Sequence, residues 1–179
     1  SNLENLSFIY DLKNNFKISD KGFFSILNKF KGLPHRQEIF LKKNNVFFIN
    51  DSKATTFEST KACLTNYKNI LWILGGLKKK DDNFNINKFK KNILSAFIIG
   101  KDRSFFKRKI NKKIKYLETI SLKQTMKYLF DKLKSISDER DSIHVILSPA
   151  SASYDQFKNF EERGNQFKKL IKFYERKYG

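Results

Sequence analysis

Short apolar runs alternate with segments of helical pattern through most of this 179-residue chain, and that alternation restricts its possible folds more than any other feature. The runs at 70–74 and 96–99 have the length and composition of strands that are buried on both faces. Strands that alternate with helices are joined by crossover connections, which favour a mainly parallel sheet covered on both sides. The sequence therefore predicts an α/β fold.

The expected elements follow one another in a clear order. Two helices, 3–16 and 20–30, precede Gly32 and Pro34, which break the chain and indicate a boundary between domains 1–31 and 32–179. "EIFLKKNNVFFIN" then reads as a hairpin that turns at Asn44 and Asn45, because asparagine tolerates the positive φ of such turns. The later elements are expected to be helix 56–67, strand 70–74, helix 84–91, strand 94–99, helix 102–109, a strand near 114–117, helix 121–135, strand 142–147 and a helix from about 155 to 177.

The chain is strongly basic, with 37 basic and 18 acidic residues and a formal net charge of +19. Such a charge suits a basic α/β module that binds nucleic acid, and that function is kept as the alternative. Arginine, which is preferred for bidentate contacts to phosphates and bases, occurs at only six positions. The lysines are spread over every exposed segment, so we expect no nucleic-acid partner.

Composition also narrows the setting of the protein. The longest apolar runs are far shorter than a membrane span, so no membrane segment is expected. Cys63 is the only cysteine, which is typical of a reducing, cytoplasmic protein, and no Cys/His group has the spacing of a zinc site. The chain opens with a helical pattern and no secretory signal, so it reads as a piece of a longer protein.

Three strand exits carry the polar residues of interest, because ligands of parallel sheets gather at the carboxyl ends of strands. The first exit is "INDSKATT". Its hydroxyls can bond nearby backbone groups, and Thr55 or Thr56 can cap the next helix, which is a purely structural role. Lys53 fits that role less well, because a cation near a helix start opposes the helix dipole unless it has an anionic partner.

The other two exits are "ILGGLKKKDD" and "ILSPASASYDQF". Gly75 and Gly76 allow a turn and the close approach of a ligand, although no GxxxxGK[ST] or GxGxxG motif occurs in the chain. In the last exit, small residues at 150–153 precede a helix start, where free N–H groups favour an anion; ordinary capping is the alternative. Together the three exits suggest a pocket for a small, doubly anionic molecule.

The order of several motifs resembles one enzyme family. The motifs are "GLPHR" (32–36), "INDSKAT" (49–55), "GG" followed by Lys79 and Asp82, "SPASASYDQF" (148–157) and "NFEERGNQF" (159–167), and "NLEN" (2–5) resembles the end of a further family element. The set is similar to the C-terminal part of the D-glutamate-adding Mur ligases, which join D-glutamate to UDP-N-acetylmuramoyl-L-alanine. "DSKAT" and "SPASASYDQFKNFEERG" are the specific motifs; "GG" and "GLPHR" are weak alone.

The resemblance implies a cytoplasmic, ATP-dependent amide ligase of peptidoglycan precursor synthesis, acting through an acyl phosphate. It implies three domains: one for the UDP-sugar peptide, a central one with the P-loop and Mg²⁺ ligands, and a Rossmann-like one that binds D-glutamate and closes over ATP. Residues 1–31 would be the last helices of the central domain, and 32–179 the whole D-glutamate domain. This chain alone would then hold no metal ligands and have no activity, and the protein is expected to be a monomer.

The resemblance also implies site residues. Those expected around D-glutamate are Thr55, Lys79, Ser153, Tyr154 and Phe160, with Lys53 near the transferred phosphate. Those expected to face ATP are Asn5, His35, Arg36 and Asp51. Lys78 and Lys80 remain alternatives to Lys79 as the carboxylate ligand, and packing remains an alternative role for His35.

Overall fold

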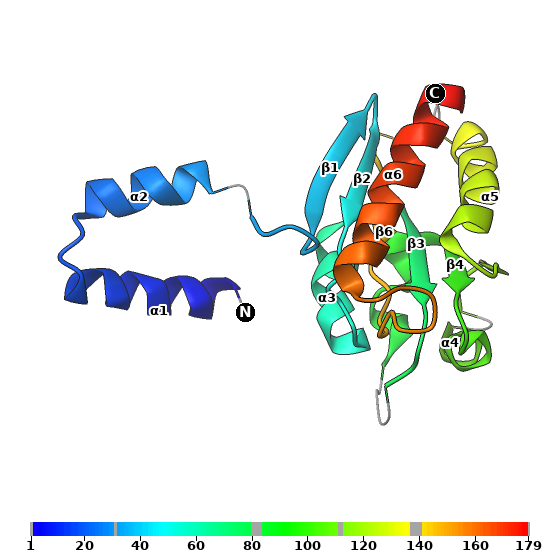
Figure 1. Cartoon of the computed structure of the whole chain (residues 1–179), viewed down its shortest axis with the longest axis horizontal. Helices are drawn as coiled ribbons and strands as arrows, with labels where there is room; N and C mark the ends of the chain where they lie inside the picture. Colours follow the sequence, from blue (N-terminus) through cyan, green and yellow to red (C-terminus); the bar gives the residue numbers. More distant parts are fainter. Residues whose placement is uncertain (1, 31, 80–83, 111–112, 137–140, 179) are drawn as a thin grey trace. The chain divides into compact units, whose positions relative to one another are not determined.

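The computed structural model describes residues 2–30, 32–79, 84–110, 113–136 and 141–178, and the backbone alone for 2–5 (Figure 1). The chain divides into two compact units, residues 1–32 and 33–179. The first unit holds α1 (Asn2–Asn15) and α2 (Asp20–Lys29). Ser19 caps α2 by accepting the N–H of Gly22, and the Lys13 ammonium lies 2.5 Å from the Asp20 carboxylate. Several large apolar side chains of this unit are exposed, among them Phe8, Ile9, Phe16, Phe24, Ile26 and Phe30.

The second unit is built on a six-stranded sheet in the order β1-β2-β6-β3-β4-β5. The strands are β1 (Glu38–Lys43), β2 (Val46–Asn50), β3 (Ile70–Gly75), β4 (Ile93–Ile99), β5 (Tyr116–Glu118) and β6 (Ile143–Leu147). β1 pairs with β2 antiparallel, and all the other pairs are parallel. The sheet confirms the predicted α/β class and is consistent with a Rossmann-like fold.

The predicted hairpin is also confirmed. β1 and β2 flank Asn44 and Asn45, and Asn44 has φ 50°, a value that asparagine adopts more readily than most residues. The register of the pair shifts between Ile39 and Leu41, so the edge strand carries a bulge.

Helices cover both faces of the sheet, as the alternating pattern predicts. They are α3 (Phe57–Asn66), α4 (Arg103–Ile110), α5 (Leu122–Lys134) and α6 (Phe160–Tyr178). α5 and α6 lie side by side on one face, where Met126, Leu129 and Phe167 join a core with strand residues (Figure 1). α3 and α4 cover the other face, in a core that includes Trp72 and Phe106.

Two predicted helix assignments are wrong. The segment expected as helix 84–91 forms two 3-10 turns, Ile86–Lys88 and Lys90–Asn92, because Asn85 accepts the N–H of Asn87 and Ile86 and Phe89 pack into the core within four residues.

The last helix begins at Phe160, not near 155. The Ser153 carbonyl accepts the N–H groups of both Gln156 and Phe157, which closes a turn in the place of the expected helix start. Asn159 then caps α6 by accepting the N–H of Glu162 at 2.7 Å.

Candidate site at the carboxyl ends of three strands

The strands β2, β6 and β3 are parallel neighbours, so their carboxyl ends meet at one edge of the sheet. Backbone hydrogen bonds continue past the strands: the Asp51 N–H donates to the Leu147 carbonyl at 2.8 Å, and the Gly75 N–H to the Pro149 carbonyl at 2.8 Å. The three strand exits therefore lie alongside one another, at the position where the strand order reverses and ligands bind in folds of this kind.

The exits of β3 and β6 are joined to each other. Leu77 and Ala152 exchange two backbone hydrogen bonds of 3.1 Å, and the Ser151 hydroxyl donates to the Gly75 carbonyl at 2.6 Å. Gly76 has φ 142°, and a Cβ there would lie 2.5 Å from the Ala152 carbonyl oxygen. A glycine is required because the two backbones approach so closely.

The exits of β2 and β6 are joined by Arg163, a residue of the first turn of α6 that is 1% exposed. Its Nε donates to the Ser52 hydroxyl at 3.0 Å, and one terminal nitrogen donates to the Ser52 carbonyl at 2.8 Å and the Ser151 carbonyl at 3.0 Å. The other terminal nitrogen lies 3.4 Å from the Ser151 hydroxyl. Burial lowers the pKa of the Arg163 guanidinium to about 10, so it remains charged at neutral pH.

Asp51 makes a second internal connection. Its Oδ2 accepts the Ser148 hydroxyl at 2.7 Å and the Cys63 thiol at 3.3 Å, and its Oδ1 accepts the Gln37 N–H at 3.1 Å. The carboxyl is buried, and this burial raises its pKa; the three hydrogen bonds oppose the shift. Burial also raises the pKa of the Cys63 thiol well above its usual value, so this cysteine is a hydrogen-bond donor and not a nucleophile.

The loop of residues 33–37 is fastened to the same edge through His35, which is buried and has φ 61°. The His35 carbonyl accepts the Lys53 N–H at 3.0 Å, and its Nδ1 lies 2.9 Å from the Asn50 amide nitrogen. Burial, followed by the nearby charge of Lys168, lowers the pKa of His35. A neutral imidazole can accept the Asn50 N–H, and the contacts give His35 a packing role.

Lys53 and Thr55, the predicted ligands of phosphate and D-glutamate from the β2 exit, do not cap α3. Thr56, not Thr55, caps α3 in a reciprocal box with Ser59, and Thr55 is exposed. Lys53 is exposed as well, and its ammonium lies 5.4 Å from the centre of the Phe160 ring. The Phe160 ring also lies near His35, with the two ring centres 6.0 Å apart.

The lysines of the β3 exit differ in their contacts. Lys78 donates its N–H to the Asp102 carboxylate at 2.9 Å, and its ammonium lies 5.7 Å from the centre of the Phe105 ring. Lys79 is exposed. Lys80, an alternative to Lys79 as the carboxylate ligand, lies outside the described residues, and so does the side chain of Asn5, which is expected to face ATP.

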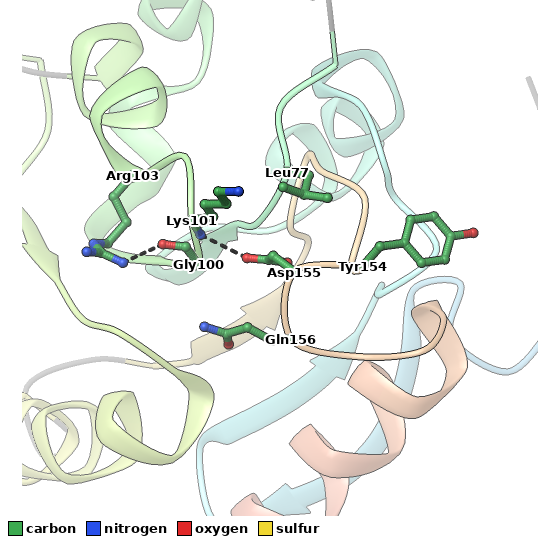
Figure 2. A pocket seen from close by; sticks show the side chains of 7 residues that line it. All are labelled: Leu77, Gly100, Lys101, Arg103, Tyr154, Asp155 and Gln156. Atoms are coloured by element: carbon green, nitrogen blue, oxygen red, sulfur yellow. Dashed lines mark hydrogen bonds between the residues drawn. The ribbon is translucent and has the colours of Figure 1, made fainter.

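The β6 exit holds a buried hydroxyl. Ser153 is 3% exposed, and within the described part of the chain its side chain has no hydrogen-bond partner. Tyr154 follows it and is 72% exposed. Its ring points away from the other labelled side chains in Figure 2.

A cavity of 440 Å³ opens beside this exit, and among the predicted residues only Tyr154 lines it (Figure 2). Asp155 accepts the Lys101 N–H at 2.8 Å in its wall, and Arg103 donates to the Gly100 carbonyl at 2.5 Å. The Asp155 and Arg103 side chains of the wall are thus engaged with the protein, and the predicted residues other than Tyr154 are not part of the cavity lining.

No protein-family model matches the chain. Curated relatives do. The chain is 34% identical to the UDP-N-acetylmuramoylalanine–D-glutamate ligase of Wolbachia pipientis wMel over 171 residues, which are 96% of this chain and 33% of that protein. It is 39% identical over 175 residues to the ligase of the same name from Buchnera aphidicola subsp. Schizaphis graminum, covering 96% and 38%, and 40% identical over 174 residues to that of Buchnera aphidicola subsp. Baizongia pistaciae, covering 94% and 36%.

The resemblance to the D-glutamate-adding Mur ligases is confirmed. The chain spans about a third of the length of these ligases. Among the residues described, no three His, Cys, Asp or Glu side chains form a group that could hold a metal ion. No helix in the described ranges is long and apolar enough to cross a membrane.

Sequence reasoning missed the internal bonds that hold this Mur-ligase-like site together, above all those of Arg163. One signal was present: Arg163, Phe167, Leu170 and Ile171 recur at the spacing of a buried helix face. An arginine in that stripe indicates a buried charge. Nothing in the sequence showed that Ser52 and Ser151 would be its acceptors.

Proposed function

We propose that this chain is the D-glutamate-binding end of an ATP-dependent ligase that adds D-glutamate to UDP-N-acetylmuramoyl-L-alanine, in cytoplasmic peptidoglycan precursor synthesis. The observation that carries the proposal is the similarity of at least 34% over 94–96% of the chain to three relatives that bear this ligase's name. The meeting of the three strand exits at one sheet edge supports it, because a dicarboxylate needs donors from more than one segment.

Each proposed ligand has a chemical task. Lys79 neutralises one carboxylate of D-glutamate, and Thr55 and Ser153 donate charge-assisted hydrogen bonds to carboxylate oxygens. The buried Ser153 hydroxyl supports this role, since a buried donor without a partner in the described structure is costly unless a ligand accepts its hydrogen bond. Phe160 forms a wall, and the backbone near Tyr154 supplies N–H donors.

The residues proposed to face ATP fit it unequally. Arg36 is exposed and can meet a phosphate or the purine. Asp51 accepts three hydrogen bonds from the protein, which leaves one acceptor position, on Oδ1, for a ribose hydroxyl. His35 is packed against Asn50, so of these three residues Arg36 is the strongest candidate. Mg²⁺ ligands are proposed to lie in the part of the ligase that precedes this chain.

The role of this chain in the reaction is to bind and orient the nucleophile. ATP would supply the phosphoryl group that activates the alanyl carboxylate. The proposed site holds both carboxylates of D-glutamate so that its neutral amine is free to attack, and Lys53 lies on the side of the transferred phosphate. Positioning of this kind lowers the barrier because the reacting groups no longer have to find one another.

Calorimetric titration tests the proposal. The full-length protein that contains this chain should bind D-glutamate saturably when nucleotide and the UDP-linked precursor are present, and L-glutamate serves as the control. The purified 179-residue chain should form no amide, since it has no P-loop. Amide formation by this chain, or salt-dependent binding of any DNA or RNA without D-glutamate binding, would contradict the proposal, and the second result would favour the nucleic-acid alternative.

A further inference from the structure

Arg163 is a buried cation that sits where a cation is costly. Among the described residues, the ion pairs of the structure do not include it, and all its hydrogen bonds go to neutral oxygens of Ser52 and Ser151. Removing a charge from water costs free energy unless an opposite charge compensates it. The Asp155 carboxylate acts on Arg163 at longer range and raises its pKa, but among the described residues it forms no ion pair with the guanidinium, so this compensation is partial. The first turn of a helix adds to the cost, because the helix dipole is positive there.

The hydrogen bonds of the Arg163 guanidinium fix the distance between the backbones of Ser52 and Ser151. A single terminal nitrogen donates to the carbonyl of Ser52 at 2.8 Å and to that of Ser151 at 3.0 Å, so the two backbones cannot separate without loss of a buried bond. The Ser52 hydroxyl also donates to the Phe160 carbonyl at 2.8 Å, which ties the same exit to α6. Ser52 directly precedes Lys53, and Ser151 lies two residues before Ser153.

We propose that Arg163 is the positioning residue of the dicarboxylate site: its planar fork sets the separation of the β2 and β6 exits, and the carboxylates of the bound ligand balance its charge. The naming of D-glutamate as that ligand rests on the proposed function. Arg163 is itself too buried to touch the ligand, so it acts through the loops and through its field. A lysine would keep the charge but could not hold both carbonyls in one plane.

Two variants of the 179-residue chain separate these effects. Arg163→Met removes both the fork and the charge, and Arg163→Lys removes the fork alone. Two control variants come from the same helix: Lys169→Met loses one exposed charge, and Leu170→Ala loses core packing without touching either exit. Binding of D-glutamate and of glutarate is measured by calorimetry and by the rise in Tm at low ionic strength.

Arg163→Met should weaken both ligands by about tenfold, within the range of coupling between neighbouring sites, and Arg163→Lys should weaken them less. The controls should bind as the parent chain does, even where Leu170→Ala lowers the Tm.

Hydrogen exchange provides a second measurement, which needs no ligand. The amides of Lys53 and Phe157, which bond to His35 and Ser153, should exchange faster in both Arg163 variants than in Leu170→Ala.

The outcomes distinguish this proposal from the proposed function. If glutarate binding to the 179-residue chain depends on Arg163 as expected, but the full-length protein with nucleotide and UDP-linked precursor shows no saturable binding of D-glutamate, the proposed function fails and the Arg163 proposal stands. If glutarate does not stabilise the parent chain, or if both Arg163 variants match Leu170→Ala in affinity and in amide exchange, the Arg163 proposal is overturned. Should Arg163→Met fail to fold, Arg163→Lys carries the same comparison, because it retains the charge.

Discussion

The contacts of Gly164 determine whether Gly164→Ala raises or lowers the free energy of unfolding. Gly164 lies in the first half of α6, where alanine normally stabilises a helix by about 1 kcal/mol relative to glycine. A Cβ at this position would lie 2.2 Å from His35 Nδ1, 2.8 Å from Asn50 Oδ1 and 2.9 Å from Asn50 Nδ2. Both neighbours are buried, so the strain cannot be relieved by moving a side-chain end into solvent.

The expected cost follows from the bonds that must give way. Asn50 lies 2.9 Å from His35 Nδ1, donates to Glu38 at 3.1 Å and accepts the Ser52 N–H at 3.2 Å. Each buried polar group left without its partner costs about 1–3 kcal/mol. With one or two bonds broken and the helix gain subtracted, Gly164→Ala should lower the free energy of unfolding by about 2 kcal/mol.

Urea unfolding followed by tryptophan fluorescence measures this change, because Trp72 is the only tryptophan and is fully buried in the second unit. The exposed neighbour Asn165 provides the control, and Asn165→Ala should raise stability by a few tenths of a kcal/mol, about 0.5 at most. If Gly164→Ala proved as stable as the parent chain or more stable, the argument from the His35 and Asn50 contacts would be refuted.

Three further substitutions test the site. The native state binds the Asp51 proton more tightly than the unfolded state, so the unsubstituted chain should lose stability as pH rises from about 4 through the raised pKa of Asp51. Asp51→Asn should abolish this loss. Urea midpoints of the two chains across that pH range check it, and parallel curves would contradict it. Ser153→Ala should weaken D-glutamate binding by about 1–2 kcal/mol in calorimetry and should raise the urea midpoint of the unliganded chain, because it removes a buried hydroxyl that has no partner within the described structure. If the full-length protein is the proposed ligase, Lys79→Ala in it should raise KM for D-glutamate and lower kcat. Lys78→Ala should change neither, because the Lys78 ammonium lies over the Phe105 ring; the reverse result would make Lys78 the ligand.

The fold was largely predictable from local pattern. Alternating apolar runs indicated the parallel sheet, and Asn44 and Asn45 indicated the hairpin, because both signals depend on neighbours along the chain. The error at 84–91 arose where short-range packing of Ile86 and Phe89 outweighs helix propensity. α6 starts late because the turn at Ser153 is not continued, and Asn159 caps the helix that begins after it.

The site was predictable only in outline. The parallel order of strands brings the three exits to one edge, which the sequence could indicate. The contacts of Arg163 with Ser52 join residues 111 positions apart, and no local pattern encodes such a pairing. The same holds for Ser148 and Asp51, whose hydrogen bond spans 97 positions. The roles of Thr55, Lys79 and Ser153 toward a ligand stay predictions.

The irregular register of the hairpin affects whether the edge of the sheet can pair with a strand of another molecule. An open sheet edge can recruit a foreign strand, and proteins resist this with bulges, lysines or very short outer strands. β1 has a bulge at Ile39–Leu41 and ends in Lys42 and Lys43, while β5 at the opposite border is the three-residue segment Tyr116–Glu118. Neither border offers a long flat template, so strand exchange between molecules is disfavoured even where the protein is concentrated.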